Sequence, residues 1–141
     1  MTLKRFFYKS IRGIDQPIIP IGIKFPSGWY PVEVYVDSGA EYTVIEAAIA
    51  ENIGFNYRQG KRVYLRVGDG SLIPVYLNEL SVQLGAVQFP CRVGFSQQLN
   101  VNFSVLGKAD VFEQFKVCFS QSQKLLTFET NECSIRQEKG S

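Results

Sequence analysis

The chain has 141 residues, which suits a single domain and is long enough for a substantial hydrophobic core. Hydrophobic residues make up 45% of it and charged residues 20%, and the formal net charge of +2 indicates neither nucleic acid nor another strongly charged partner. The absence of histidine excludes a Ser-His-Asp triad, a Cys-His pair and histidine metal sites.

The cysteines and the N-terminus bear on the compartment. Cys91, Cys118 and Cys133 are odd in number and widely spaced, which favours a reducing, cytoplasmic environment over a disulfide framework. The N-terminal stretch is basic and has no acid before Asp15, which is typical of an ordinary basic terminus, with a cleaved transit segment as the alternative. No apolar run approaches the roughly 20 residues of a membrane helix, so we expect no membrane partner.

One domain is predicted over residues 18–130, after an N-terminal segment (residues 1–17) and before a polar tail (residues 131–141) that we expect to be frayed. Residues 18–25 and 30–36 are predicted to form two strands paired around the turn signal PSG. A short helix fits residues 46–52, with Gly54 near its end as a C-cap.

A series of alternating apolar positions follows this helix. Residues 63–67 and 73–77 predict a hairpin with the glycine-rich tip GDGS, and residues 80–84 and 87–93 predict two more strands. The alternation stops at GKADVFEQF, where Asp110 and Glu113 suit a capping box at the start of a second short helix. Strands near residues 117–119 and 125–128 complete the pattern, which predicts a compact, barrel-like all-β domain.

The strand that ends at Val36 runs directly into Asp37, Ser38 and Gly39. A carboxylate at the end of a buried strand is costly unless its charge is used. Ser38 supplies a hydroxyl that can bond to the backbone, and Gly39 lets the chain turn and another backbone approach closely. All three residue types are also common in turns, so the triplet alone fits a plain turn after a strand.

Three segments, taken together, resemble one protein family. VDSGAEYTVI resembles the active-site segment of the retropepsin-like aspartic proteases, and RVGDGSLIPV (residues 66–75) is similar to the flap hairpin that covers their substrate. SVLGKADVFEQFKVCF (residues 104–119) resembles the second signature of the family, with Gly107 in the place of the signature glycine. The segments follow the order of the family and the resemblance spans about residues 18–128.

The resemblance implies a fold, an activity and a set of site residues. The fold would be an all-β, closed retropepsin-like barrel or sandwich with a flap hairpin and one or two short helices. The activity would be that of an aspartic endopeptidase without metal or cofactor, and Asp37 would be its catalytic residue. Support of the active site would fall to Ser38, Gly39, Ala40 and Gly107, and substrate contact to Glu41, Val67, Gly68, Asp69 and Gly70.

The chain departs from the family after the signature glycine. Lys108 stands where the family has an arginine that pairs with an acid shortly after the catalytic turn, and Glu41 occupies the position of that acid. Lysine cannot form the bidentate fork of arginine. We therefore expect a Glu41–Lys108 structural brace to be looser than the pair in the family.

Peptide hydrolysis by carboxylates requires two of them. One ionised carboxylate activates a water molecule while a protonated partner donates to the carbonyl oxygen, and the two share a proton. The chain has a single D-[ST]-G, so the chemistry implies a C2 homodimer in which each subunit gives one Asp37. Ser38 would bond across the two-fold axis, and residues 68–70 would close over a peptide or protein substrate bound as an extended strand.

Other interpretations remain beside this one. The alternative function is a non-catalytic dimerisation or peptide-binding domain on the same fold, and an unrelated β-barrel adaptor is a third. GDGS also fits a plain hairpin turn, and a metal site at Asp37 and Asp69 would lack a glycine-bounded ligand loop. We expect Cys91 and the apolar face of ADVFEQF to pack in the core, and aromatic residues 6–8 to lie in the core or an interface.

Overall fold

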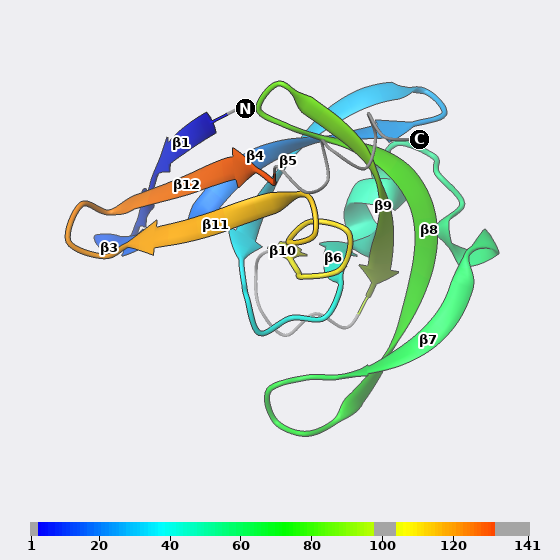
Figure 1. Cartoon of the computed structure of the whole chain (residues 1–141). Helices are drawn as coiled ribbons and strands as arrows, with labels where there is room; N and C mark the ends of the chain where they lie inside the picture. Colours follow the sequence, from blue (N-terminus) through cyan, green and yellow to red (C-terminus); the bar gives the residue numbers. More distant parts are fainter. Residues whose placement is uncertain (1–2, 98–103, 132–141) are drawn as a thin grey trace.

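The computed structural model describes residues 3–97 and 104–131 and is built mainly from β-strands (Figure 1). The largest sheet has seven strands in the order β4 (Ile18–Phe25), β5 (Gly28–Val36), β10 (Ser104–Leu106), β6 (Thr43–Glu46), β9 (Val87–Ser96), β8 (Leu72–Leu84) and β7 (Lys61–Arg66). Strand β4 also pairs with β8, which closes the sheet into a barrel and leaves β7 outside the closure. The predicted all-β barrel is therefore confirmed.

The barrel interior is filled by the apolar positions of the alternating strands. Ile19, Ile21 and Ile23 of β4 are buried, and they share this core with Val34 and Val36 of the antiparallel partner β5. Every second residue of a strand points to the same face, so the alternation in the sequence becomes the inner wall of the barrel. The predicted pairing of these two strands is confirmed.

A second sheet joins the two ends of the described chain. Its three strands have the order β1 (Leu3–Phe7), β12 (Leu125–Thr130) and β11 (Phe115–Ser120), all antiparallel. Phe128 contacts both Phe6 and Phe115 with edge-to-face ring geometry. A short hairpin of β2 (Lys9–Ile11) and β3 (Ile14–Gln16) follows β1. The N-terminal segment thus packs on the last strands, and residues 132–141 of the expected tail lie outside the described part.

Helical structure is limited within the described residues to α1 (Ala47–Asn52) and the short 3-10 helix η1 (Tyr57–Gln59). Gly54 follows α1 with a φ of 76°, the left-handed conformation expected of a residue just after a helix end. No helix in the described part of the chain is long and apolar enough to cross a membrane.

Two sequence expectations differ from the structure. The predicted second helix is wrong, because residues 108–114 form a bend followed by turns instead of a helix. The two strands expected at residues 73–77 and 80–84 are one strand, β8. Asn78 interrupts the apolar alternation, yet its amide donates to the carbonyl oxygen of Tyr57 (2.9 Å) and so is satisfied while buried.

Candidate active site

The turn at Asp37 begins where β5 ends and is held by its own backbone. The amide of Asp37 donates to the carbonyl oxygen of Leu106 (3.0 Å), which extends the parallel pairing of β5 with β10. The amide of Ala40 donates back to the carbonyl oxygen of Asp37 (3.2 Å) and closes the turn. The amide of Gly39 donates to Oδ1 of Asp37 (2.8 Å), so this carboxylate has a fixed direction.

The exposed side of this turn presents polar groups to solvent. The Asp37 side chain is half-buried and Ser38 and Gly39 are exposed. The Ser38 hydroxyl makes no hydrogen bond to any residue that the structure describes. A half-buried carboxylate and an exposed serine thus lie on one turn.

The second signature segment lies directly against this turn. The amide of Gly107 donates to the hydroxyl of Thr43 (3.2 Å), and a Cβ at this position would lie 2.3 Å from the carbonyl oxygen of Tyr42. Only glycine permits this approach. The amide of Lys108 then donates to the carbonyl oxygen of Ala40 (2.9 Å), and that of Ala109 to the carbonyl oxygen of Glu41 (2.9 Å). The structure thus brings together the two segments that the sequence singled out.

The side chains of Glu41 and Lys108 do not form this link. Both are exposed, and the ion pairs found among the described residues are Lys9–Glu33 and Arg92–Asp110. The contact between the two segments is made by main-chain hydrogen bonds instead. Lysine is a compact, strongly hydrated charge, which is consistent with its remaining in solvent here.

Arg92 and Asp110 form a charged pair that the sequence did not reveal. Burial alone would raise the pKa of Asp110, but hydrogen bonds from the Arg92 side chain and amide, with the Arg92 charge, hold it below its ordinary value. The same contact raises the pKa of Arg92. Asp110 was expected to cap a helix, and only one half of that box exists, because its amide donates to Oε1 of Glu113 (3.3 Å). No pattern in a single sequence links residues 18 positions apart across two elements.

The β7–β8 hairpin has the shape expected of a flap, and its tip is closed by internal bonds. Oδ1 of Asp69 accepts from the amide (2.9 Å) and the hydroxyl (2.6 Å) of Ser71, and these bonds lower the pKa of Asp69. The amide of Gly70 donates to the carbonyl oxygen of Val67 (2.8 Å), and Gly70 has a φ of 88° that few other residues adopt. Gly68, Asp69 and Gly70 are all exposed. The predicted hairpin and tip are confirmed.

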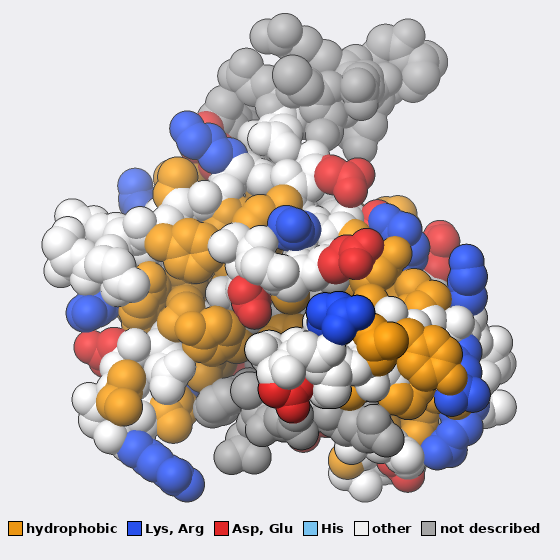
Figure 2. Space-filling model, turned by 90° about the horizontal axis from the view of Figure 1, so that it is seen from below, with side chains coloured by type: hydrophobic (Ala, Val, Ile, Leu, Met, Phe, Trp, Pro, Cys, Tyr) orange, Lys and Arg blue, Asp and Glu red, His pale blue; other side chains and the backbone are white. Residues whose placement is uncertain are grey.

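One face of this hairpin packs over the strand that follows Asp37. Val44 of β6 forms a small buried cluster with Ile73 and Val75 of β8. Partly buried hydrophobic residues from β7, β8, β10 and the adjoining loops pack against it: Tyr42, Val63, Leu65, Val67, Leu77 and Val105. The hairpin and the turn of residues 37–42 project from the same side of the barrel (Figure 1). Seen from that side, hydrophobic side chains gather on the surface among scattered charges (Figure 2). Apolar surface thus lies on the side of the barrel from which the Asp37 turn projects.

The structure also places the other residues that the sequence analysis considered for binding or chemistry. Burial, followed by the negative charge of Asp110, raises the pKa of Cys91 to about 12, so this thiol is a packing residue. Phe6 packs on the core, whereas Phe7 is 80% exposed. No group of three or more cysteine or acidic residues within the described ranges is placed to hold a metal ion.

The architecture is similar to that of a solved aspartic protease and of a solved protease-like domain. A retropepsin-like aspartic protease from Rickettsia conorii superposes with a TM-score of 0.65 at 16% identity, covering 90% of this chain and 91% of that one. The retroviral protease-like domain of Ddi1 from Leishmania major superposes with a TM-score of 0.53 at 18% identity, covering 84% and 95%. No protein-family model and no curated protein sequence matches the chain. The chain has the retropepsin-like fold.

Proposed function

We propose that the chain is an aspartic endopeptidase that acts as a homodimer, with one Asp37 from each subunit. The observation that carries the proposal is the Asp37 turn: a half-buried carboxylate, directed by the Gly39 amide, at a turn clamped by the amides of Lys108 and Ala109. This turn lies on a fold shared with a solved retropepsin-like aspartic protease and a solved retroviral protease-like domain. The exposed Ser38 would donate its hydroxyl to a second such turn across a two-fold axis.

The mechanism follows from bringing two such turns together. Two carboxyl groups in contact cannot both ionise easily, so they share a proton and titrate as a pair. The ionised Asp37 removes a proton from a water molecule while that water attacks the peptide carbonyl carbon. The protonated Asp37 of the second subunit donates its proton to the carbonyl oxygen. The flap hairpins, with tips at residues 68–70, would cover a substrate bound as an extended strand.

The test is an Asp37→Asn variant assayed for cleavage of a mixed peptide library. We expect the rate to fall by roughly ten-thousandfold or more, with the melting temperature nearly unchanged. Asp15→Asn, which changes an exposed aspartate on β3, is the matched control and should retain full activity. Dilution below the dimer dissociation constant should also abolish the activity of the wild type. Cleavage by Asp37→Asn at the wild-type rate would contradict the proposal.

The absence of a Glu41–Lys108 ion pair among the described residues favours a second candidate, a non-catalytic dimerisation or peptide-binding domain on the same fold. This candidate predicts that the wild-type chain dimerises or binds peptides from the library and cleaves none of them. Peptide binding by both the wild type and Asp37→Asn, without products in either, would select it over the endopeptidase.

A further inference from the structure

Arg92, on the barrel strand β9, is bound to Asp110 in the segment that clamps the turn of residues 37–42. Its Nε donates to Oδ2 of Asp110 (3.0 Å), its Nη2 to Oδ1 (3.3 Å), and its own amide also donates to Oδ2 (2.8 Å). Both carboxylate oxygens are therefore occupied by one residue. The planar guanidinium fork restricts the position of its partner in a way that a lysine cannot.

We propose that Arg92 and Asp110 are positioning residues that hold the catalytic turn, in place of the brace that Glu41 and Lys108 do not form. The inference rests on the proposed function, since it assigns a role around Asp37. Neither side chain is a catalytic residue. They act on Asp37 through the main chain of the segment between them.

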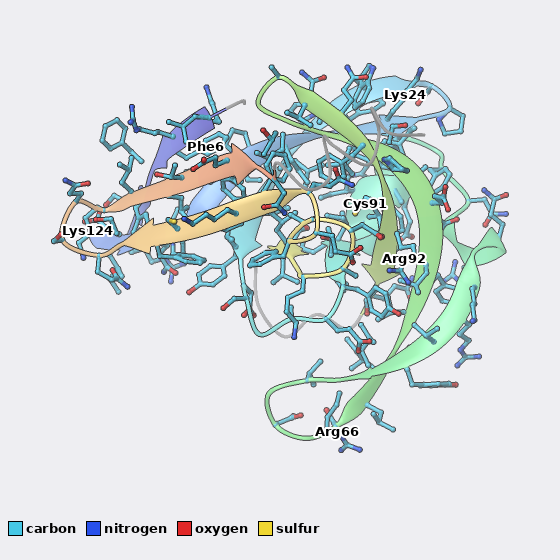
Figure 3. All side chains as sticks on the ribbon, in the orientation of Figure 1. Phe6, Lys24, Arg66, Cys91, Arg92 and Lys124 are labelled. Atoms are coloured by element: carbon cyan, nitrogen blue, oxygen red, sulfur yellow. The ribbon has the colours of Figure 1, made fainter. Side chains whose placement is uncertain are left out.

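The route from the fork to the turn is short and made of observed contacts. Asp110 directly follows Lys108 and Ala109, whose amides donate to the carbonyl oxygens of Ala40 and Glu41 (both 2.9 Å). Fixing the carboxylate of Asp110 on β9 therefore fixes the two donors that clamp the turn. Figure 3 shows Arg92 extending from β9 beside the loop that precedes β11.

Arg92 also contacts the turn from its other side. Its guanidinium carbon lies 5.4 Å from the centre of the Tyr42 ring, within the range of a cation–π contact. Tyr42 is the residue whose carbonyl lies against Gly107. One guanidinium thus touches both chain segments that meet at the active site.

The backbone conformation of Asp110 is energetically unfavourable and is maintained together with the fork. Its φ of 67° lies in the left-handed region, which a residue other than glycine occupies only when its surroundings impose it. Aspartate and asparagine tolerate this conformation better than most residues. The side chain of Asp110 is only 22% exposed, so the pair is not a fully solvated surface contact.

The experiment compares Asp110→Asn and Arg92→Lys with the matched control Glu33→Gln, which breaks the exposed Lys9–Glu33 pair. Asparagine keeps the shape and the left-handed tolerance of Asp110, so the variant removes the charged fork with little other change. The first readout is amide hydrogen exchange at Lys108 and Ala109. We expect exchange about tenfold or more faster in both fork variants and unchanged in the control.

The second readout separates positioning from general stability. With rates divided by active-site concentration, kcat should fall by roughly tenfold to a hundredfold in both fork variants while KM changes by less than about twofold. Unchanged exchange at Lys108 and Ala109 in Asp110→Asn or Arg92→Lys would overturn the inference, and so would an unchanged kcat in an active enzyme. If one of the two fork variants fails to fold, the other fork variant alone tests the inference. If the wild type cleaves nothing, the proposed function fails while the exchange readout still decides whether the fork holds the turn.

Discussion

The amide of Lys108 donates a hydrogen bond to the carbonyl oxygen of Ala40, and this bond joins the two segments of the candidate active site. The residue before Lys108 makes it possible, because Gly107 lies against the backbone of Tyr42 with no room for a side chain. The charge of Lys108 takes no part in the link. The backbone of this signature segment, and the glycine that lets it approach, thus hold the turn that carries Asp37.

Gly107→Ala should disrupt this junction. The added Cβ would lie 2.3 Å from the carbonyl oxygen and 2.4 Å from the carbonyl carbon of Tyr42, so backbone would have to move. We expect the free energy of unfolding to fall by about 1–3 kcal/mol or more, as for other overpacked core sites. Urea denaturation followed by tryptophan fluorescence measures the change.

Gly68→Ala is the matched control for that measurement. A Cβ at Gly68 would meet nothing within 4 Å, and the φ of Gly68 is not in the left-handed range. The free energy of unfolding should therefore change by less than about 0.5 kcal/mol. Equal losses in the two variants would contradict the explanation by close approach.

Much of the fold could be predicted because it depends on local patterns. The alternation of Val32, Val34 and Val36 places one face of β5 in the core, and GDGS forms the tip of a hairpin. The continuity of β8 could not be predicted, since Asn78 breaks the alternation and is satisfied only by the distant Tyr57 carbonyl. The partner of Asp110 could not be predicted either, because this contact also joins residues that are distant in the sequence. A capping box is a local pattern, whereas the choice of Arg92 depends on how β9 packs.

The Arg92–Asp110 pair should contribute to stability in a defined pH range. The folded-state pKa of Asp110 is below the ordinary value of 3.8, so the folded chain binds this proton less tightly than the unfolded chain. The stabilisation is therefore present above about pH 4 and is lost as the pH falls through the folded-state pKa. We expect Asp110→Asn to reduce the slope of unfolding free energy against pH below about pH 4.

Chemical denaturation of the variant and the wild type across this pH range measures the difference between the slopes. The other carboxylates titrate in both proteins, so their contributions to the slope cancel when the two slopes are compared. Parallel curves for the wild type and Asp110→Asn would show that the carboxylate of Asp110 is not held by Arg92 in solution.

The two described cysteines should differ in reactivity. Cys118 is exposed, whereas burial raises the pKa of Cys91 to about 12 and also shields its sulfur. In a Cys133→Ser background at pH 8, we expect a thiol reagent such as Ellman's reagent to modify one thiol quickly and the second only after unfolding. The double variant Cys118→Ser, Cys133→Ser should show no fast phase. A fast phase in that variant would mean that Cys91 is accessible.

Ser71→Ala should change the titration of Asp69 at the tip of the β7–β8 hairpin. The Ser71 hydroxyl donates to Oδ1 of Asp69 (2.6 Å) and is the largest cause of the lowered pKa of that carboxylate. Removing the hydroxyl should raise the pKa toward 3.8 without reaching it, because the amide of residue 71 still donates to the same oxygen. NMR titration of the side-chain carboxyl carbon measures the shift, with Ser81→Ala, at an exposed site on β8, as the control. If the pKa of Asp69 stays the same in Ser71→Ala, the tip is held by its main-chain bonds alone, and the hydroxyl adds nothing to its order.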